Sequence, residues 1–218
     1  MDTLKFIADR WNLDLGNPSP IKFKISRFLS LMKLYSDLGF KKGAEIGVCR
    51  GWYSMILCDR IPGLHLYCID PWKSYPDYTE NHHDQKGMDE YCSATKHRMR
   101  KRNCTIIRKT SMEAVKDFED GSLDFVFIDG NHSFEYVTED IAAWSKKVRV
   151  GGIVSGHDYF NSAELKKGLW VEKMNKQETI RLCQVKDVVD AWTKAYHVNP
   201  WFVITGDKCP TWFWVKEG

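Results

Sequence analysis

A short apolar run near the middle of this 218-residue chain constrains its fold more than any other feature. Leu123 and residues 125–128 are all apolar or aromatic, and the sequence Asp-Gly-Asn-His (129–132) follows directly. Such a run is typical of a parallel strand that helices cover on both faces. Ligands of open α/β sheets bind outside the carboxyl ends of the strands. The run therefore predicts a ligand site at Asp129 and His132.

Strand and helix patterns alternate along most of the chain. Apolar runs predict five strands, at 44–48, 64–70, 104–108, 123–128 and 153–154. Residues 201–205 and 211–215 predict a closing hairpin. We therefore expect an α/β fold, a Rossmann-like sandwich with a mostly parallel, seven-stranded sheet and a C-terminal antiparallel hairpin.

Two segments surround this pattern without belonging to its regular alternation. Residues 21–38 have helical spacing, which predicts a helix that ends at Gly39. We expect residues 1–38 to form a helical cap over the substrate site and residues 39–218 to form the main domain. The irregular segment 71–87 carries several aromatic rings and predicts a lid over the ligand.

Composition excludes several classes of protein. The chain has 32 basic and 29 acidic residues, which gives no support for a general nucleic-acid surface. We interpret the basic run 97–102 as the solvated end of a helix. No apolar run approaches the roughly 18 residues of a membrane span. Seven scattered cysteines without a Cys-x-x-Cys pair indicate reduced thiols and a cytoplasmic location.

Polar residues end the predicted strands and would meet at one edge of the sheet. They are Glu45 and Gly47 on the first strand, Asp70 on the second, Asp129 on the fourth, and His157 and Asp158 on the fifth. Asp70 could accept hydrogen bonds from both hydroxyls of a ribose, which favours a nucleoside ligand. The glycine turn Gly47–Gly51 lacks the middle glycine of a dinucleotide fingerprint. A carboxylate at Glu45 also suits an amine or a sulfonium better than a pyrophosphate.

The segment 45–54, Glu-Ile-Gly-Val-Cys-Arg-Gly-Trp-Tyr-Ser, resembles motif I of class I S-adenosylmethionine-dependent methyltransferases. Residues 111–159 resemble methyltransferase family 24, and motif I is similar to that of the catechol and sugar O-methyltransferases. Together these motifs cover about residues 40–160. The resemblance implies the class I methyltransferase sandwich, S-adenosylmethionine as cofactor and transfer of a methyl group to a hydroxyl oxygen.

The resemblance also implies a role for each matching residue. The cofactor-binding set consists of Glu45, Gly47, Gly51, Ser54, Asp70, Ser111, Met112 and Asp129. Within this set, Asp70 would bind the ribose hydroxyls, and Ser111 and Met112 would flank the adenine. Asp129 would lie near the sulfonium and act in catalysis together with His132, the expected general base.

The sequence leaves the metal and the acceptor open. The resemblance places Asp129, His157 and Asp158 at metal-ligand positions, where they would hold Mg²⁺ or another divalent cation. In the alternative, His157 is the base and no metal binds. The expected partner is a small-molecule or saccharide acceptor bound by residues 1–38, 71–87 and 159–183, with self-association left open. An NAD-dependent oxidoreductase and a non-catalytic module that binds S-adenosylmethionine are the competing functions.

Overall fold

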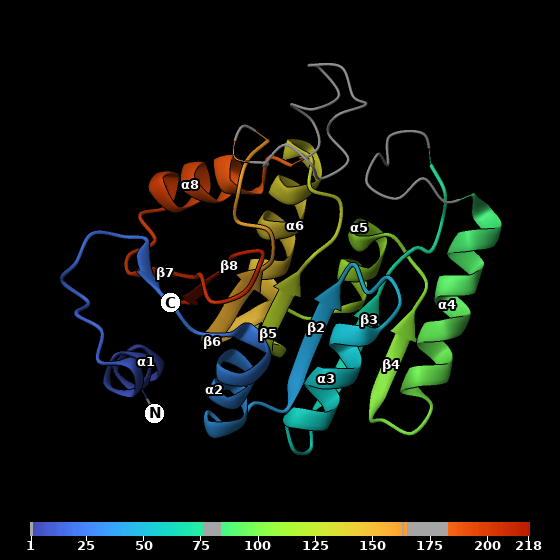
Figure 1. The fold of residues 1–218 in the computed structure, drawn as a ribbon, viewed down its shortest axis with the longest axis horizontal. Helices are drawn as coiled ribbons and strands as arrows, with labels where there is room; N and C mark the ends of the chain where they lie inside the picture. The colour runs from blue at the N-terminus through green and yellow to red at the C-terminus, as the bar shows by residue number, and fades with distance from the viewer. Residues whose placement is uncertain (1, 76–83, 163, 165–182) are drawn as a thin grey trace.

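The computed structural model describes residues 2–75, 84–162, 164 and 183–218. A single sheet of eight strands crosses the molecule, in the order β1-β7-β8-β6-β5-β2-β3-β4 (Figure 1). The strands are β1 (Ile21–Phe23), β2 (Lys42–Ile46), β3 (His65–Ile69), β4 (Cys104–Ile107), β5 (Leu123–Ile128), β6 (Val148–Gly156), β7 (Trp201–Ile204) and β8 (Thr211–Val215). Only β8 runs antiparallel to its neighbours, β6 and β7. The expected mostly parallel sheet with a C-terminal hairpin is therefore confirmed, and β1 adds an eighth strand at its edge.

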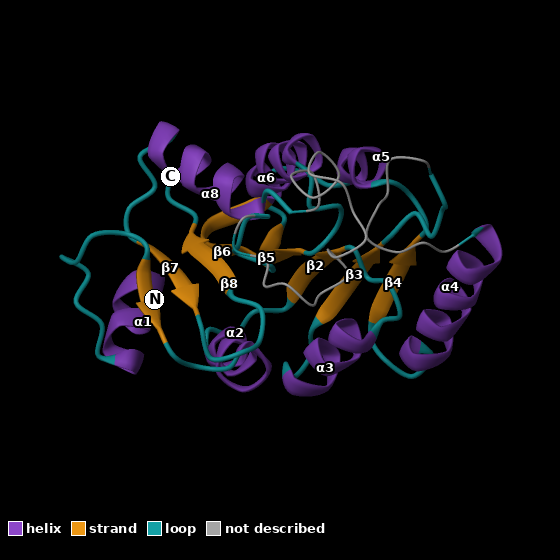
Figure 2. Cartoon of the chain, turned by 45° about the horizontal axis from the view of Figure 1, so that its top comes forward, coloured by secondary structure: helices purple, strands orange, loops and turns teal. Residues whose placement is uncertain are grey.

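Helices cover both faces of the sheet, as Figure 2 shows. One face carries α1 (Thr3–Trp11), α2 (Met32–Asp37), α3 (Trp52–Arg60) and α4 (Gln85–Met99). The other carries α5 (Ser111–Ala114), α6 (Phe134–Lys147) and α8 (Val185–Ala195). Short turns extend two of them: a π-helical turn, Arg27–Leu31, leads into α2, and a 3₁₀ turn, Val115–Asp117, follows α5. The architecture is the α/β sandwich that the alternating pattern predicted.

The central strand β5 is buried on both faces, as its apolar run predicted. Phe125 packs in the core on the α2 side, where its ring stacks on Tyr35 at 4.4 Å between centroids. Val126 points into the opposite core, which includes Trp144 of α6. Burying a side chain of this size contributes about 1.5–3 kcal/mol. Residues 125–128 therefore fix β5 in the middle of the sheet and hold Asp129 at its edge.

Two local expectations were wrong at their boundaries. Residues 21–23 form strand β1 instead of a helix, because they pair in parallel with 202–204 of β7. This pairing spans about 180 residues of sequence and overrides the local helical spacing. The last strand of the parallel set, β6, begins at Val148 instead of residue 153, because Val148 pairs with Leu123 of β5. Gly39 does end α2, with φ +71° and its N–H donating to Ser36 O at 3.0 Å.

Two further features bear on the composition argument. The basic run 97–102 lies at the carboxyl end of α4, as its pattern predicted. Arg102 pairs there with Asp59 of α3 at 2.7 Å. Among the helices of the described residues, none has the length and apolar character needed to cross a bilayer.

Candidate active site

Four parallel strands end in one row at the carboxyl edge of the sheet. The aligned partners across β3, β2, β5 and β6 are Ile69, Ile46, Ile128 and Gly156. The residues that follow them in the chain are Asp70, Gly47, Asp129 and His157. Strand register thus brings together residues up to 110 positions apart, all of which the sequence pattern had placed at a ligand edge.

Gly47 allows the end of β2 to approach the backbone that follows β5 closely. Its φ is +87°, and a Cβ built on it would lie 2.0 Å from the backbone oxygen of Asp129. Its N–H donates to Ile69 O at 2.9 Å, and the N–H of Asp129 donates to Ile46 O at 2.8 Å. No other residue type fits here without moving the backbone that carries Asp129.

Asp70 is held by backbone donors on both of its oxygens. Cys49 N donates to Oδ2 at 2.8 Å, and Trp72 N donates to Oδ1 at 2.7 Å. Burial raises the pKa of this carboxyl, and the backbone N–H groups act against that rise. The indole Nε1 of Trp72 also donates to Cys49 O at 2.7 Å. These bonds join the turn after β2 to the segment after β3.

A cavity of about 460 Å³ opens at this edge of the sheet. This volume lies in the range of small-molecule and cofactor pockets. Five of the predicted cofactor residues line it, namely Gly47, Asp70, Ser111, Met112 and Asp129. Trp72 and Tyr75, from the segment predicted to form a lid, also line it. Residues 76–83 of that segment lie outside the described residues.

Glu45, Ser54 and Gly51 occupy a different place. Glu45 and Ser54 are almost fully buried and lie outside the cavity lining, where Ser54 Oγ donates to Glu45 Oε2. Burial raises the pKa of Glu45 to about 8. Gly51 has φ +71° and precedes the first residue of α3. Glu45 and Ser54 therefore link β2 to α3 by a buried hydrogen bond, and Gly51 ends the turn between these two elements.

Asp140, a buried acid on the wall of the cavity, was not among the site residues predicted from the sequence. Ser111 Oγ donates to Asp140 Oδ1, and Trp144 Nε1 donates to Ser111 Oγ at 2.7 Å. Burial raises the pKa of Asp140 to about 7. A signal was present, because Asp140 lies three residues after Val137 and four before Trp144, on the apolar face of α6.

Beyond Asp129, two histidines and a second carboxylate form a cluster. His132 Nε2 lies 3.4 Å from Asp129 Oδ1 and 3.5 Å from Asp158 Oδ2. His157 Nδ1 lies 3.4 Å from Asp129 Oδ1 and 3.0 Å from Asp158 Oδ1. The structure therefore brings together all four residues that the sequence proposed as base or metal ligands.

The charged groups of this cluster shift one another's pKa values. Burial favours the neutral form of Asp129, but His157 and His132 outweigh it and hold the pKa of this carboxyl well below its usual range. Burial lowers the pKa of His157, because it disfavours the charged imidazolium. The carboxylates of Asp129 and Asp158 nevertheless raise this pKa to about 9. Nε2 of His157 is buried and has no hydrogen-bond partner within the described part of the chain. Two carboxylates facing two imidazoles form an electrostatic environment suited to a cation or to proton transfer.

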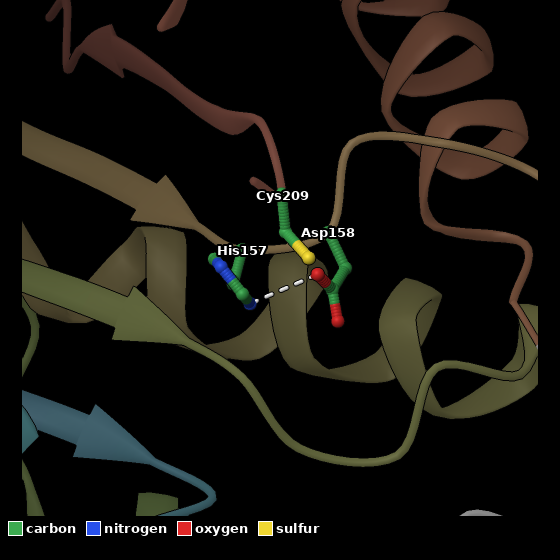
Figure 3. A group of neighbouring side chains, drawn as sticks. All are labelled: His157, Asp158 and Cys209. Atoms are coloured by element: carbon green, nitrogen blue, oxygen red, sulfur yellow. Dashed lines mark ion pairs between the residues drawn. The ribbon is translucent and has the colours of Figure 1, made fainter. Parts of the chain in front are cut away.

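Cys209 joins this cluster from the loop between β7 and β8. One donor atom from each of His157, Asp158 and Cys209 lies within 4.8 Å of the others. Figure 3 shows the Cys209 sulfur directed toward the Asp158 carboxylate. Burial, followed by the charge of Asp158, raises the pKa of the Cys209 thiol to about 11. Sequence reasoning gave no sign of this contact, because Cys209 is one of seven scattered cysteines and lies 51 residues beyond Asp158.

Strained backbone gathers at the same edge of the sheet. Cys49, Trp72 and Asp158 have φ values of 52°, 40° and 51°, in the left-handed region that side chains other than glycine rarely adopt. Each follows a different strand, β2, β3 or β6. Strain of this kind costs about 1–3 kcal/mol per residue and is concentrated at functional sites in proteins.

Sequence comparison identifies the family to which this chain is similar. A family model described as a methyltransferase domain, family 24, matches residues 44–159. The uncharacterized protein y4gI of Sinorhizobium fredii is 27% identical over 132 residues, which is 58% of this chain and 14% of that protein. The chain thus spans only a small part of the length of this relative.

Solved structures show the same fold at low sequence identity. A putative caffeoyl-CoA O-methyltransferase from Staphylococcus aureus has a TM-score of 0.64 at 13% identity, covering 97% of this chain and 90% of that one. An O-methyltransferase from Bacillus cereus, in complex with SAH, has a TM-score of 0.59 at 13% identity, covering 98% and 89%. TomG from Streptomyces achromogenes, in complex with SAM, has a TM-score of 0.58 at 15% identity, covering 100% and 91%.

The family match runs from the second half of β2 to just beyond β6. It therefore contains every strand end that contributes to the cavity and to the histidine–carboxylate cluster. With this match and the shared fold, the chain belongs to methyltransferase family 24 and has the Rossmann-like sandwich of the class I methyltransferases.

Proposed function

We propose that this protein transfers the methyl group of S-adenosylmethionine to a hydroxyl oxygen of a small molecule or saccharide. The observation that carries the proposal is the single row of strand ends at Asp70, Gly47, Asp129 and His157. Asp129 in this row lines a cofactor-sized cavity and also belongs to the cluster of acid–base groups.

We assign the parts of the cofactor to different walls of the cavity. Asp70 is a carboxylate at the cavity wall that can accept the two ribose hydroxyls. The side chains of Ser111 and Met112, at the start of α5, bound the end of the cavity proposed for the adenine. Asp140 lies beside Ser111 and offers a carboxyl group toward the same end. Asp129 provides negative charge near the position proposed for the sulfonium.

The chain's own residues then carry out the proton chemistry. S-adenosylmethionine supplies a methyl group that its sulfonium already activates. His132 takes the proton of the acceptor hydroxyl at Nδ1, while its Nε2–H faces the two carboxylates. The acceptor oxygen forms a bond to the methyl carbon as the sulfur–carbon bond breaks, leaving S-adenosylhomocysteine. Asp129 and Asp158 balance the positive charge that develops on His132.

A divalent cation fits the same cluster. Asp129, His157 and Asp158 provide two carboxylates and an imidazole, and His157 Nδ1 lies 3.4 Å from Asp129 Oδ1 and 3.0 Å from Asp158 Oδ1. We propose these residues as its ligands. Such an ion would lower the pKa of the acceptor hydroxyl and orient it.

Equilibrium binding tests the first half of this proposal. Calorimetric titration of the purified protein should show binding of S-adenosylmethionine and of S-adenosylhomocysteine, and no binding of NAD⁺. Absence of S-adenosylmethionine binding at millimolar concentration would overturn the proposal, and NAD⁺ binding would favour an oxidoreductase.

Turnover tests the second half. A panel of hydroxyl-bearing small molecules and saccharides should include acceptors that cause release of S-adenosylhomocysteine. Tight cofactor binding with no release across the panel would favour a non-catalytic binding module. A parallel assay with amine-bearing acceptors distinguishes transfer to oxygen from transfer to nitrogen.

A further inference from the structure

We propose that Cys209 completes a mixed sulfur, nitrogen and oxygen site with His157, Asp158 and Asp129. This site would take a divalent transition-metal ion such as Zn²⁺, Fe²⁺ or Co²⁺ in preference to Mg²⁺. The inference deepens the cation site of the proposed function and rests on it, while adding a ligand and a metal class that the sequence pattern did not predict.

The donor atoms already have the spacing of a small coordination site. Ligands bound to a tetrahedral ion at about 2.0–2.3 Å lie roughly 3.3–3.8 Å apart. His157 Nδ1 lies 3.4 Å from Asp129 Oδ1 and 3.0 Å from Asp158 Oδ1. The sulfur of Cys209 lies within 4.8 Å of its two partners in the cluster. His157, Asp158 and Cys209 thus form a group of three donors, and Asp129 is next to them through its contact with His157.

The Cys209 thiol determines which class of metal ion the site favours. Mg²⁺ demands an octahedron of oxygen ligands and does not favour sulfur, whereas Zn²⁺, Fe²⁺ and Co²⁺ accept thiolate, imidazole and carboxylate together. A cluster of carboxylates and a histidine alone would fit either class. Figure 3 shows the sulfur on the same side of Asp158 as the His157 ring.

The loop that carries Cys209 is anchored on both sides. Asp207 accepts hydrogen bonds from Ser26 Oγ at 2.9 Å and from Arg27 N at 2.6 Å. Tyr159 N, next to Asp158, donates to Pro210 O at 3.0 Å. These bonds fix the residues adjacent to Cys209 and Asp158 against each other, which preorganises the pair as metal ligands.

His132 remains available as the base in this arrangement. Its Nε2 faces Oδ2 of Asp158, while His157 faces Oδ1 of the same carboxylate. Oδ1 of Asp158 can therefore bind the ion together with His157, while Oδ2 faces His132. The four proposed ligands leave the acid–base role of His132 unchanged.

Cobalt spectroscopy tests the proposal without an activity assay. The purified protein, stripped of metal with a chelator and then titrated with Co²⁺, should show a thiolate-to-cobalt charge-transfer band in the near ultraviolet. Cys209→Ser should lose this band, and its dissociation constant for Co²⁺ should rise by more than about tenfold. Even the loss of a residue that only hydrogen-bonds to a metal ligand typically weakens metal binding by at least that factor. Asp158→Asn should also weaken Co²⁺ binding, and excess Mg²⁺ should not displace the ion.

Two further variants serve as controls. Cys58→Ser changes another half-buried cysteine, on α3, and should leave the band intact. Cys49→Ser changes the exposed cysteine beside the cavity and should also leave it intact. The proposal fails if wild-type protein shows no band, if the band survives in Cys209→Ser, or if Mg²⁺ competes equally. Titration with S-adenosylmethionine on the same samples shows separately whether the proposed function stands.

Discussion

The backbone N–H of Cys49 donates to Asp70 Oδ2 at 2.8 Å, so the turn after β2 is tied to the carboxylate that ends β3. The second oxygen of Asp70 accepts the N–H of Trp72 at 2.7 Å. A carboxylate fixed by two backbone donors keeps its remaining lone pairs in a defined direction. Asp70 therefore links the turn after β2 to the end of β3, and it is also a preorganised acceptor for a ligand.

Asp70→Asn should weaken S-adenosylmethionine binding by about 10- to 100-fold, because a hydrogen bond to a charged group contributes about 1.5–3 kcal/mol. The amide keeps the size of the side chain but loses its charge and one acceptor oxygen. Calorimetric titration measures the change. Asp59→Asn, which alters a carboxylate paired with Arg102 at the other end of the sheet, is the matched control. Equal affinities of Asp70→Asn and wild type would exclude Asp70 from the cofactor site.

Gly47→Ala should destabilise the fold by about 3 kcal/mol or more, because the new methyl group would collide with the backbone that follows β5 as well as require an unfavourable φ. Urea unfolding measures the loss. Gly39→Ala isolates the conformational cost, since Gly39 also has a positive φ but has no atom within 4 Å of a built Cβ. This control should lose only about 1–2 kcal/mol. Similar losses in the two variants would show that the close contact with Asp129 has little weight.

Asp140 should make the stability of the ligand-free protein fall as pH rises. Its pKa is raised from 3.8 to about 7 in the folded protein, so the folded state binds this proton more tightly than the unfolded chain does. The stabilisation is complete below about pH 4, declines between pH 4 and pH 7, and is lost above that range. At about 1.4 kcal/mol per pH unit, the loss is on the order of 4 kcal/mol.

Asp140→Asn removes this titration while keeping an acceptor for Ser111 Oγ. The variant should match wild type near pH 4 and exceed its stability at pH 8, as measured by urea unfolding across that range. Asp120→Asn changes an exposed acid on the surface and should leave the pH profile parallel to that of wild type. If Asp140→Asn also runs parallel to wild type, Asp140 is already ionised in the folded state at neutral pH.

His132→Ala should reduce the rate of methyl transfer by about 10²- to 10⁴-fold, the usual contribution of a general base, without changing S-adenosylmethionine affinity. Single-turnover measurement of S-adenosylhomocysteine formation tests the rate, and calorimetry tests the affinity. His132→Asn repeats the test with a polar side chain. His65→Ala, at the opposite end of β3, should be fully active. A fully active His132→Ala would remove the base assignment and favour His157.

The sequence predicted the residues whose signal is local. An apolar strand that ends on an acid can be recognised within ten residues, as at 123–129 and 64–70, and parallel strands necessarily place such ends at one edge. These local patterns placed Asp70, Asp129, His132 and His157 at the ligand edge of the sheet. The same reasoning failed for residues 21–23, because their partner strand lies near the other end of the chain.

What the sequence determined by itself is the alternation of buried strands and helices, and hence the sheet and the edge at which polar residues collect. Hydrophobic periodicity indicates which side of an element is buried, and that information is sufficient to predict how the helices and strands of this fold are layered. Only the tertiary structure decided which polar residues share the site. It brought Cys209 to Asp158 and His157, and it placed Asp140 beside Ser111. Both contacts depend on packing between distant segments, and no short window of sequence contains the two partners.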